Sequence, residues 1–286
     1  MIHFVANIRS GRGRALKNVK KLTDYCIKNE IDYSLHVTHR KGHAIDIARE
    51  LSKEEGAIII AVGGDGTFHE VINGIIDFSK VKVGFIPSGR GNDFARAAGF
   101  SLDPIKALND ILRGEETYFD YIQVGPVRCL NVGGTGMDVD VLKRVDGSSS
   151  KLTYLKSLIG CLSKFDPYPV EVTVNGETKS YNCLLAAICN GTCIGGNMKV
   201  SPLSKIDDNM LDLIIVVCPD ANVFPLLPKF LKGKHIYEDW GVHIKCESAK
   251  ITCNRLPIQL DGEIYEDLEL DCHIVKNGIR TFKISK

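Results

Sequence analysis

The sequence has 286 residues, of which 44% are hydrophobic and 25% are charged, a composition typical of a globular protein with one large domain or two smaller ones. Lysine and arginine total 36 against 35 acidic residues. A formal net charge of +1 lacks the strong positive field of a nucleic-acid-binding protein, so we expect no nucleic-acid partner. The opening MIHFVANIRSGRG has no signal-peptide core, and no stretch approaches the roughly 18 apolar residues of a membrane span. We therefore expect a cytoplasmic protein with reduced, buried cysteines.

The first 117 residues alternate short apolar runs with helical patterns. Strands are predicted at 3–8, 33–38, 57–62 and 81–86, and helices at 14–29, 43–53, 68–77 and 103–112. Continuous apolar runs are expected of parallel strands that are covered on both faces. The alternation predicts an α/β domain at 1–117 with an open, doubly wound sheet, whose ligands bind at the carboxyl ends of the strands.

From residue 118 onward the hydrophobic period changes to two, the period of half-buried strands. Asn175-Gly176 predicts a type I′ hairpin, and helical inserts are predicted at 151–164 and 221–232, with a polar interruption at 146–150. The pattern predicts an all-β, sandwich-like second domain at 118–286, and a return of the last strand to the first domain stays open. Short strands are predicted at 119–124, 127–133, 170–174, 178–188, 211–217, 242–248, 249–254, 257–263 and 268–275.

Three glycine-rich turns follow predicted strands of the first half. They lie at 7–13, 63–67 and 87–92. Glycines let a backbone approach a phosphate closely, and a helix N-terminus after such a turn favours an anion. Asp65 lies inside the second turn, where a carboxylate is unfavourable unless a cation or proton transfer involves it. Thr67 and Glu70 have capping-box spacing, whereas the dinucleotide fingerprint and the P-loop are both absent.

Two of these turns carry a family resemblance. GGDGT followed by HEVINGI, and PSGRGNDFARAAG one strand later, resemble the diacylglycerol kinase catalytic domain of the bacterial lipid kinases. GGDGT is shared with NAD kinases, whereas PxGxxNDFAR at this offset is highly specific. The segments GTCIGGNMKVSP, LSKIDDNMLDLIIV and PIQLDGE extend the resemblance over essentially the whole chain. It implies an NAD kinase/phosphofructokinase-like first domain and a kinase that uses ATP and Mg²⁺ to phosphorylate a hydroxyl of diacylglycerol or a related lipid.

The resemblance also implies roles for individual residues. Asp65 would help to hold the catalytic Mg²⁺, and Glu263 would take the proton from the lipid hydroxyl. Asp207 would point toward the active centre. A structural Mg²⁺ would bind Asp208 and the backbone carbonyls of Lys205 and Met210. ATP would lie against Asn7, Ser10, Gly11, Thr38, Gly64, Asp65, Gly66, Thr67, Glu70, Gly89 and Arg90.

Departures from the family pattern leave alternatives open. Arg90 stands where a small hydroxyl residue is usual, and it either binds phosphate or crowds the nucleotide. Asn209 replaces a glycine but tolerates a left-handed backbone. Without the resemblance, Glu263 is a solvated hairpin acid and Asp207-Asp208 an exposed turn. The alternatives to a lipid kinase are an NAD-kinase-like enzyme with a soluble acceptor and a catalytically silent nucleotide- or lipid-binding regulator.

Two amphipathic segments are candidates for contact with the lipid substrate. Segment 222–235 combines apolar residues with Lys229, Lys232 and Lys234, which suits an interface with anionic headgroups, or else a core-packing helix with a basic end. Segment 151–165 either lines a lipid cleft or covers the sandwich. Transient, peripheral contact with the inner membrane surface and a homodimer both stay open.

Overall fold

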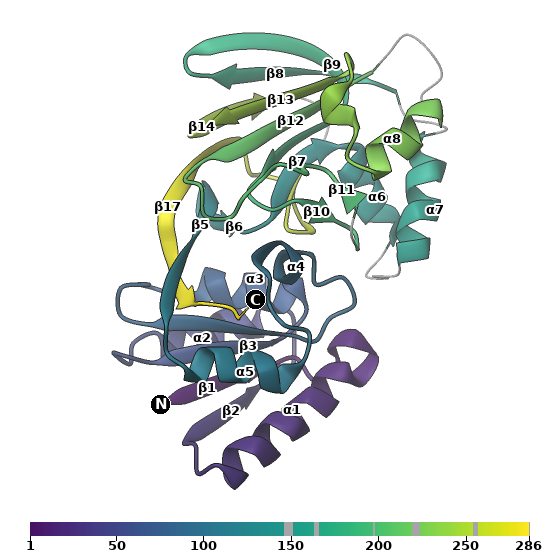
Figure 1. Cartoon of the computed structure of the whole chain (residues 1–286). Helices are drawn as coiled ribbons and strands as arrows, with labels where there is room; N and C mark the ends of the chain where they lie inside the picture. Colours follow the sequence, from purple (N-terminus) through teal and green to yellow (C-terminus); the bar gives the residue numbers. More distant parts are fainter. Residues whose placement is uncertain (146–150, 163–165, 197, 219–223, 254–256, 286) are drawn as a thin grey trace. The chain divides into compact units, whose positions relative to one another are not determined.

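The computed structural model describes residues 1–145, 151–162, 166–196, 198–218, 224–253 and 257–285. The chain divides into two compact units, one formed by residues 1–119 with 277–286 and the other by residues 120–276 (Figure 1). It passes from the first unit into the second within strand β5 (Glu116–Val124) and returns within β17 (Leu270–Phe282). The polar interruption predicted at 146–150 lies outside the described residues, as do residues 221–223 of the second predicted insert.

Four parallel strands form the sheet of the first unit, in the order β2-β1-β3-β4 (Figure 1). Strands β1, β3 and β4 are buried along most of their length, whereas β2 is a partly exposed edge strand. All four carboxyl ends lie at one edge of the sheet, because the strands are parallel. The strands are β1 (Ile2–Ala6), β2 (Tyr33–Val37), β3 (Ile58–Gly63) and β4 (Lys82–Pro87).

Helices cover both faces of this sheet. Helix α1 packs against α5, and α2 packs against α3. Right-handed crossovers place α1 on the face opposite α2 and α3, because the chain moves outward from β1 to β2 and then back across β1 to β3. The predicted doubly wound α/β domain is confirmed. The helices are α1 (Ser10–Lys28), α2 (His43–Leu51), α3 (Asp65–Gly74), α4 (Asp93–Ala98) and α5 (Pro104–Leu112).

The C-terminal residues 277–285 complete the first unit. Arg280 donates two hydrogen bonds to the Glu116 carboxylate, at 2.8 and 3.1 Å, and Lys82 Nζ lies 2.5 Å from the same group. The Thr281 hydroxyl donates to the carbonyl oxygen of Val83 in β4 (2.7 Å). These cations hold the pKa of Glu116 down at about 2. The end of β17 is therefore fixed to the first unit by ion pairs as well as by backbone contacts.

Antiparallel strands build the second unit, and the predicted β-sandwich is confirmed. The branch point is β9, which pairs with β7, β8 and β12. Asn175 and Gly176 connect β8 to β9 with φ of 52° and 80°, as the predicted type I′ turn requires. The remaining strands are β6 (Val127–Cys129), β7 (Val132–Gly136), β8 (Tyr168–Val174), β9 (Glu177–Cys189), β10 (Cys193–Ile194), β11 (Met198–Lys199), β12 (Leu211–Val217), β13 (Gly241–Cys246), β14 (Ser248–Thr252), β15 (Ile258–Leu260) and β16 (Glu263–Tyr265).

The helices of the second unit pack onto the sandwich. They are α6 (Met137–Val145), α7 (Lys151–Leu162) and α8 (Leu227–Leu231), with 3₁₀ turns at Phe224–Leu226 and His235–Tyr237. Leu158, Cys161 and Leu162 of α7 are buried, so this side of the helix covers the core. Within the described ranges, every helix falls short of the length and hydrophobicity that spanning a bilayer requires.

The described part of segment 222–235 is folded back onto the same core. Phe230 is buried against the ring of His235, at a centroid distance of 4.8 Å, and Leu227 and Leu231 pack beside it. Lys229 pairs with Glu238 at 2.7 Å. These apolar side chains therefore stabilise the fold, as expected of a core-packing helix.

Candidate functional site

The first glycine-rich turn leads from β1 into α1 through a left-handed stretch of backbone. Gly11, Arg12 and Gly13 have φ of 62°, 58° and 83°, so the regular helix begins only after them. A Cβ at Gly11 would overlap the backbone carbonyl oxygen of Ser88, in the third turn. Glycine is therefore required at position 11 both by the backbone conformation and by the closeness of the neighbouring turn.

The second and third turns touch through their glycines. A Cβ at Gly89 would lie 2.5 Å from the Cα of Gly64, and one at Gly64 would lie 3.3 Å from the Ser10 hydroxyl oxygen. The Ser88 N–H also donates to the carbonyl oxygen of Gly63 (2.6 Å). Turns that follow β1, β3 and β4 therefore form one interlocked cluster at the carboxyl edge of the sheet, which we call the glycine-turn cluster (residues 7–13, 63–67 and 87–92).

Side chains of α1 hold the third turn in place. Arg14 Nη1 donates to the carbonyl oxygen of Gly89 (3.0 Å), and the buried Asn18 donates from Nδ2 to the Ser88 hydroxyl (2.8 Å). Asn92 has a left-handed backbone and closes the turn on itself, accepting from the Gly89 N–H at 2.9 Å and donating to its carbonyl oxygen at 3.1 Å. Asn92 belongs to the PxGxxNDFAR motif, whereas Arg14 and Asn18 lie outside the motifs.

Asp65 links the second turn to the helix that follows the third. Its Oδ2 accepts from the backbone N–H of Asp93 (3.0 Å), and its Oδ1 accepts from that of Phe94 (3.2 Å). A carboxylate at a helix N-terminus satisfies unpaired N–H groups and interacts favourably with the helix dipole. Asp65 thus fixes α4 against the glycine-turn cluster. Its predicted role toward a magnesium ion remains a prediction.

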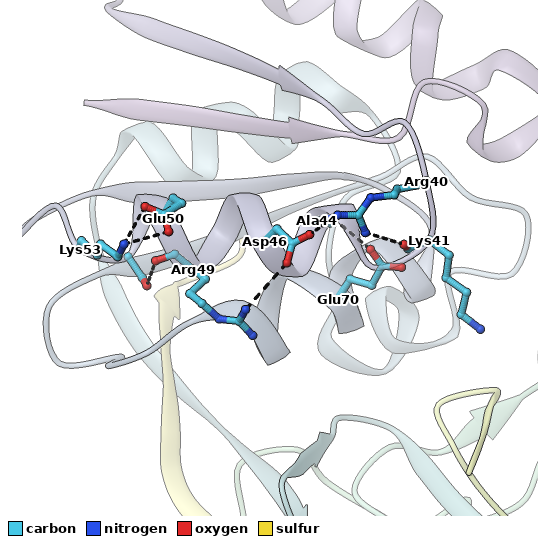
Figure 2. Close-up of polar contacts among 9 residues, drawn as sticks. Arg40, Lys41, Ala44, Asp46, Arg49, Glu50, Lys53 and Glu70 are labelled. Atoms are coloured by element: carbon cyan, nitrogen blue, oxygen red, sulfur yellow. Dashed lines mark hydrogen bonds and ion pairs between the residues drawn. The ribbon is translucent and has the colours of Figure 1, made fainter. Parts of the chain in front are cut away.

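The capping-box prediction for Thr67 and Glu70 is wrong, because the Glu70 carboxylate caps a different helix. It accepts from the backbone N–H groups of Gly42 (2.9 Å) and Ala44 (3.1 Å), at the start of α2. Figure 2 shows the Glu70 carboxylate close to Ala44. The cap of α3 is Gly64, with an extended backbone. Thr67 is buried against Gly63. Glu70 therefore joins α3 to α2, and its predicted contact with ATP remains a prediction.

The other residues predicted to contact ATP lie at the same edge of the sheet. The Thr38 N–H donates to the carbonyl oxygen of Ala6, which places Thr38 beside the first turn, and the Asn7 N–H donates to the carbonyl oxygen of Val62. Arg90 is exposed at the tip of the third turn. The structure thus brings the predicted ATP residues of four strand ends together, with Glu70 turned toward α2.

The second unit presents the Asp261-Gly262-Glu263 turn between β15 and β16. Asp261 and Gly262 have φ of 53° and 89°, the signs that a type I′ turn needs at both central positions. The Asp261 carboxylate accepts from the backbone N–H groups of Leu130 (2.7 Å) and Asn131 (2.8 Å). Glu263 directly follows this turn and is partly buried. Burial of the nearby Tyr265, together with the negative charges of Glu263 and Asp261, raises the pKa of Tyr265 to about 12.

The Asp207-Asp208 turn has the backbone form that the sequence analysis expects. Asn209 is left-handed, with a φ of 64°, and its N–H donates to the buried Asp120 carboxylate (2.7 Å). Lys245 Nζ lies 2.5 Å from Asp208 Oδ2 and 3.5 Å from the buried Asp212. An ammonium group therefore neutralises the carboxylate that was predicted to bind a structural Mg²⁺.

The structural magnesium site at Asp208 and the backbone carbonyls of Lys205 and Met210 remains a prediction. Mg²⁺ takes six oxygen ligands in near-ideal octahedral geometry, and in this structure the Lys245 ammonium lies against Asp208 Oδ2. Lys205 and Asp207 are exposed, and Met210 donates its N–H to Asp208 Oδ1 at 3.3 Å. Among the described residues, no group of three or more His, Cys, Asp and Glu side chains is arranged to hold a metal ion.

Comparison with known proteins finds two family models that match this chain. Residues 1–124 match the family model of the diacylglycerol kinase catalytic domain, and residues 131–282 match that of the YegS C-terminal NAD kinase beta sandwich-like domain. A diacylglycerol kinase of Bacillus subtilis (strain 168) is 29% identical over 268 residues, covering 91% of this chain and 88% of the relative. A diacylglycerol kinase of Staphylococcus carnosus (strain TM300) is 27% identical and covers 92% and 89%.

Solved structures show the same fold. A crystal structure of a diacylglycerol kinase from Bacillus anthracis str. Sterne has a TM-score of 0.74 at 20% identity, covering 98% of this chain and 96% of that one. An NAD kinase from Archaeoglobus fulgidus, solved in complex with ATP, has a TM-score of 0.58 at 12% identity and covers 100% and 95%. The chain belongs to the family of lipid kinases that join a diacylglycerol kinase catalytic domain to a YegS-type β-sandwich domain.

Proposed function

We propose that this protein transfers the γ-phosphate of ATP to a hydroxyl group of diacylglycerol or a related lipid, in the presence of Mg²⁺. The observation that carries the proposal is the glycine-turn cluster, in which three strand ends approach so closely that Gly11 and Gly89 leave no room for a side chain and Gly64 leaves little. A cluster of this kind exposes backbone to a ligand at the N-terminus of α3. Such a position favours the phosphates of a nucleotide.

Charge near the cluster supports the same role. Arg9, Arg12 and Arg90 are exposed on its first and third turns. Arginine forms strong, charge-assisted hydrogen bonds with phosphate oxygens, which a kinase needs because phosphoryl transfer relies on positioning and on charge stabilisation. In this proposal Arg90 binds phosphate.

A bound magnesium ion would offset the charge of the phosphates, and Asp65 is the residue of the cluster that would hold it. Mg²⁺ in kinases is commonly bound by one or two carboxylates together with substrate phosphates and water. By capping α4, Asp65 keeps its own carboxylate at a fixed position in the cluster. We propose no role for a metal at Asp208.

Glu263 is the proposed general base. The lipid hydroxyl oxygen forms a bond to the γ-phosphorus, the bond between that phosphorus and the β,γ-bridging oxygen of ATP breaks, and ADP leaves. Glu263 takes the proton of the hydroxyl group as it attacks. The type I′ turn supports this role because Asp261 anchors it to two backbone N–H groups, which limits the positions that the Glu263 backbone can adopt.

The experiment that tests the proposal is transfer of labelled γ-phosphate from ATP and Mg²⁺ to a panel of acceptors in mixed micelles. The panel contains diacylglycerol, a sphingoid base, ceramide and phosphatidylglycerol, with NAD as a soluble acceptor. Label in a lipid, and its loss when Mg²⁺ is chelated, supports the proposal. Label in NAD alone would contradict the lipid kinase and indicate an NAD kinase instead. The fold similarity to an ATP-bound NAD kinase is the reason for testing this alternative. ATP binding with no labelled acceptor would favour a regulator.

A further inference from the structure

A buried chain of hydrogen bonds runs beneath the turn that carries Glu263. Asp138, in the first turn of α6, is 5% exposed, and Gln259, in β15, is 2% exposed. Gln259 Nε2 donates to Asp138 Oδ2 (2.9 Å), and Gln259 Oε1 accepts from the backbone N–H of Gly262 (2.9 Å). Two hydrogen bonds therefore connect the buried Asp138 carboxylate to the Gly262 amide. Gly262 directly precedes Glu263, the proposed base.

This chain has a fixed direction. An ionised carboxylate only accepts hydrogen bonds, and a backbone N–H only donates. A carboxamide accepts through its oxygen and donates through its NH₂ group. A proton on Asp138 Oδ2 that donated to Gln259 would require the carboxamide to rotate and to present its NH₂ group to the N–H of Gly262. Two donors would then face each other. A proton donated from Oδ2 of Asp138 therefore costs Gly262 its partner, while Oδ1 is already engaged by the backbone N–H of Val139 (2.9 Å).

The surroundings of Asp138 make this change of state accessible. Burial raises the pKa of Asp138 to about 6, and the negative charge of Asp140 adds to this effect, while the hydrogen bond from Gln259 opposes it. The titratable groups on neighbouring strands are Tyr168 of β8 and the thiols of Cys183 and Cys189 in β9. Burial raises the pKa of all three, so they stay neutral at neutral pH.

We propose that Gln259 is a positioning residue, which couples Asp138 to the amide of Gly262 and so fixes the half of the turn that presents Glu263. The other half is fixed separately, by the contacts of the Asp261 carboxylate with Leu130 and Asn131. Uptake of a proton by Asp138 releases Gly262 and loosens the backbone at Glu263. The consequence for catalysis rests on the proposed function, whereas the coupling itself does not.

The coupling is testable by NMR without any assay of activity. The sequence contains three Asp-Gly pairs, at 65–66, 146–147 and 261–262. Protein labelled with carbonyl-¹³C aspartate and ¹⁵N-glycine therefore gives three selected amide signals, and the signal lost on Asp261→Asn identifies Gly262. We expect the Gly262 amide to titrate with a midpoint near pH 6. It should no longer do so in Gln259→Leu or in Asp138→Asn.

Gln123 offers a matched control, because it and Gln259 are the two glutamines of the chain. Its Nε2 donates to the nearby carbonyl oxygens of Gly125 and Val127, within the β5–β6 hairpin. Gln123→Leu should leave the Gly262 titration unchanged. The coupling would be overturned if the Gly262 amide shift did not change with pH in the folded wild type. It would also be overturned if that shift titrated with the same midpoint and amplitude in Gln259→Leu.

Kinetics test the consequence for catalysis. On the lipid that the wild type phosphorylates, Gln259→Leu should lower kcat by about 10- to 100-fold, leave the KM for ATP within about twofold, and flatten the part of the pH profile near pH 6. Gln123→Leu should keep the wild-type profile. A coupled Gly262 together with an unchanged kcat profile would overturn the positioning role. A coupled Gly262 in a protein that phosphorylates no lipid would refute the proposed kinase and uphold the coupling.

Discussion

The glycine-turn cluster of the first unit and the Glu263 turn of the second are held in place by different means. In the cluster, backbone meets backbone at Gly64 and Gly89, and the acidic residues of the motif cap neighbouring helices. The Glu263 turn depends on side-chain contacts: the Asp261 carboxylate anchors one half, and Gln259 together with Asp138 holds the other. A motif residue in the cluster therefore serves the fold as well as the ligand, whereas the position of Glu263 depends on neighbouring side chains and, through Gln259, on Asp138 in a distant segment.

The largest expected effect comes from adding one methyl group to the cluster. In Gly89→Ala the new Cβ would lie 2.5 Å from Gly64 Cα and 2.8 Å from Asn92 Oδ1, and there is little room to adjust because the first atom is backbone and the Asn92 side chain is hydrogen-bonded to Gly89. We expect ATP binding to be lost and the free energy of unfolding to fall by about 1–3 kcal/mol. Calorimetry and urea unfolding check both.

Gly66→Ala is the stability control for this variant. A Cβ at Gly66 has no neighbour within 4 Å, so the free energy of unfolding should fall by less than about 0.5 kcal/mol or rise slightly. Equal stability of the two variants would show that the turns are not packed as closely as described.

The next effect separates the two roles of Asp65. Asparagine keeps one oxygen to accept an N–H of α4 but loses the charge. Asp65→Asn should lower phosphate transfer by about 10²-fold while the free energy of unfolding falls by about 1 kcal/mol or less. Steady-state rates and urea unfolding, measured on the same preparation, check this. Loss of transfer in proportion to loss of folded protein would mean that Asp65 serves only as a cap.

A smaller effect is expected at Glu70. Glu70→Ala removes the acceptor for two N–H groups of α2 and should cost about 1 kcal/mol of the free energy of unfolding. Glu50→Ala, on the exposed side of α2, removes only the ion pair with Lys53 and should cost about 0.5 kcal/mol or less (Figure 2). If Glu70→Ala weakens ATP binding more than about tenfold, roughly 1.4 kcal/mol, Glu70 contacts the nucleotide as well.

The smallest effect tests how the end of the chain is tied to the first unit. The pKa of Glu116 is held at about 2 instead of 4.5 by Arg280 and Lys82. A lowered pKa means that this stabilisation is complete above about pH 4.5 and is lost as the pH falls toward 2. Glu116→Gln should therefore be less stable than the wild type at pH 7, with the difference shrinking below pH 4.5, as measured by urea unfolding. A difference independent of pH would exclude the ion pairs as its source.

Much of the fold is predictable from the sequence because apolar runs and glycines carry it. Predicted strands and observed strands agree closely in the first unit, and Asn175-Gly176 forms the expected hairpin. The predicted start of α1 at residue 14 coincides with the end of the left-handed stretch at 11–13. Helix α3 begins three residues before its predicted start at 68, because the glycine-rich turn itself folds into the first helical turn.

The partners of the site residues are not predictable in the same way. Gln259 and Asp138 are 121 residues apart, and Glu70 and the Gly42 amide are 28 apart. Hydrogen bonds between distant segments leave no period in the sequence, and a single glutamine in a strand carries no signal. Lys245 likewise gives no sign that it neutralises Asp208.

The most direct test of the account is the rate of phosphate transfer from ATP to lipid micelles by wild type and Glu263→Gln, with ATP affinity measured on the same preparations. We predict that the wild type labels lipid and that Glu263→Gln does so about 10²-fold or more slowly, with ATP affinity unchanged. Equal transfer by the two proteins would contradict the assignment of the base, and no transfer by the wild type would contradict the lipid kinase itself.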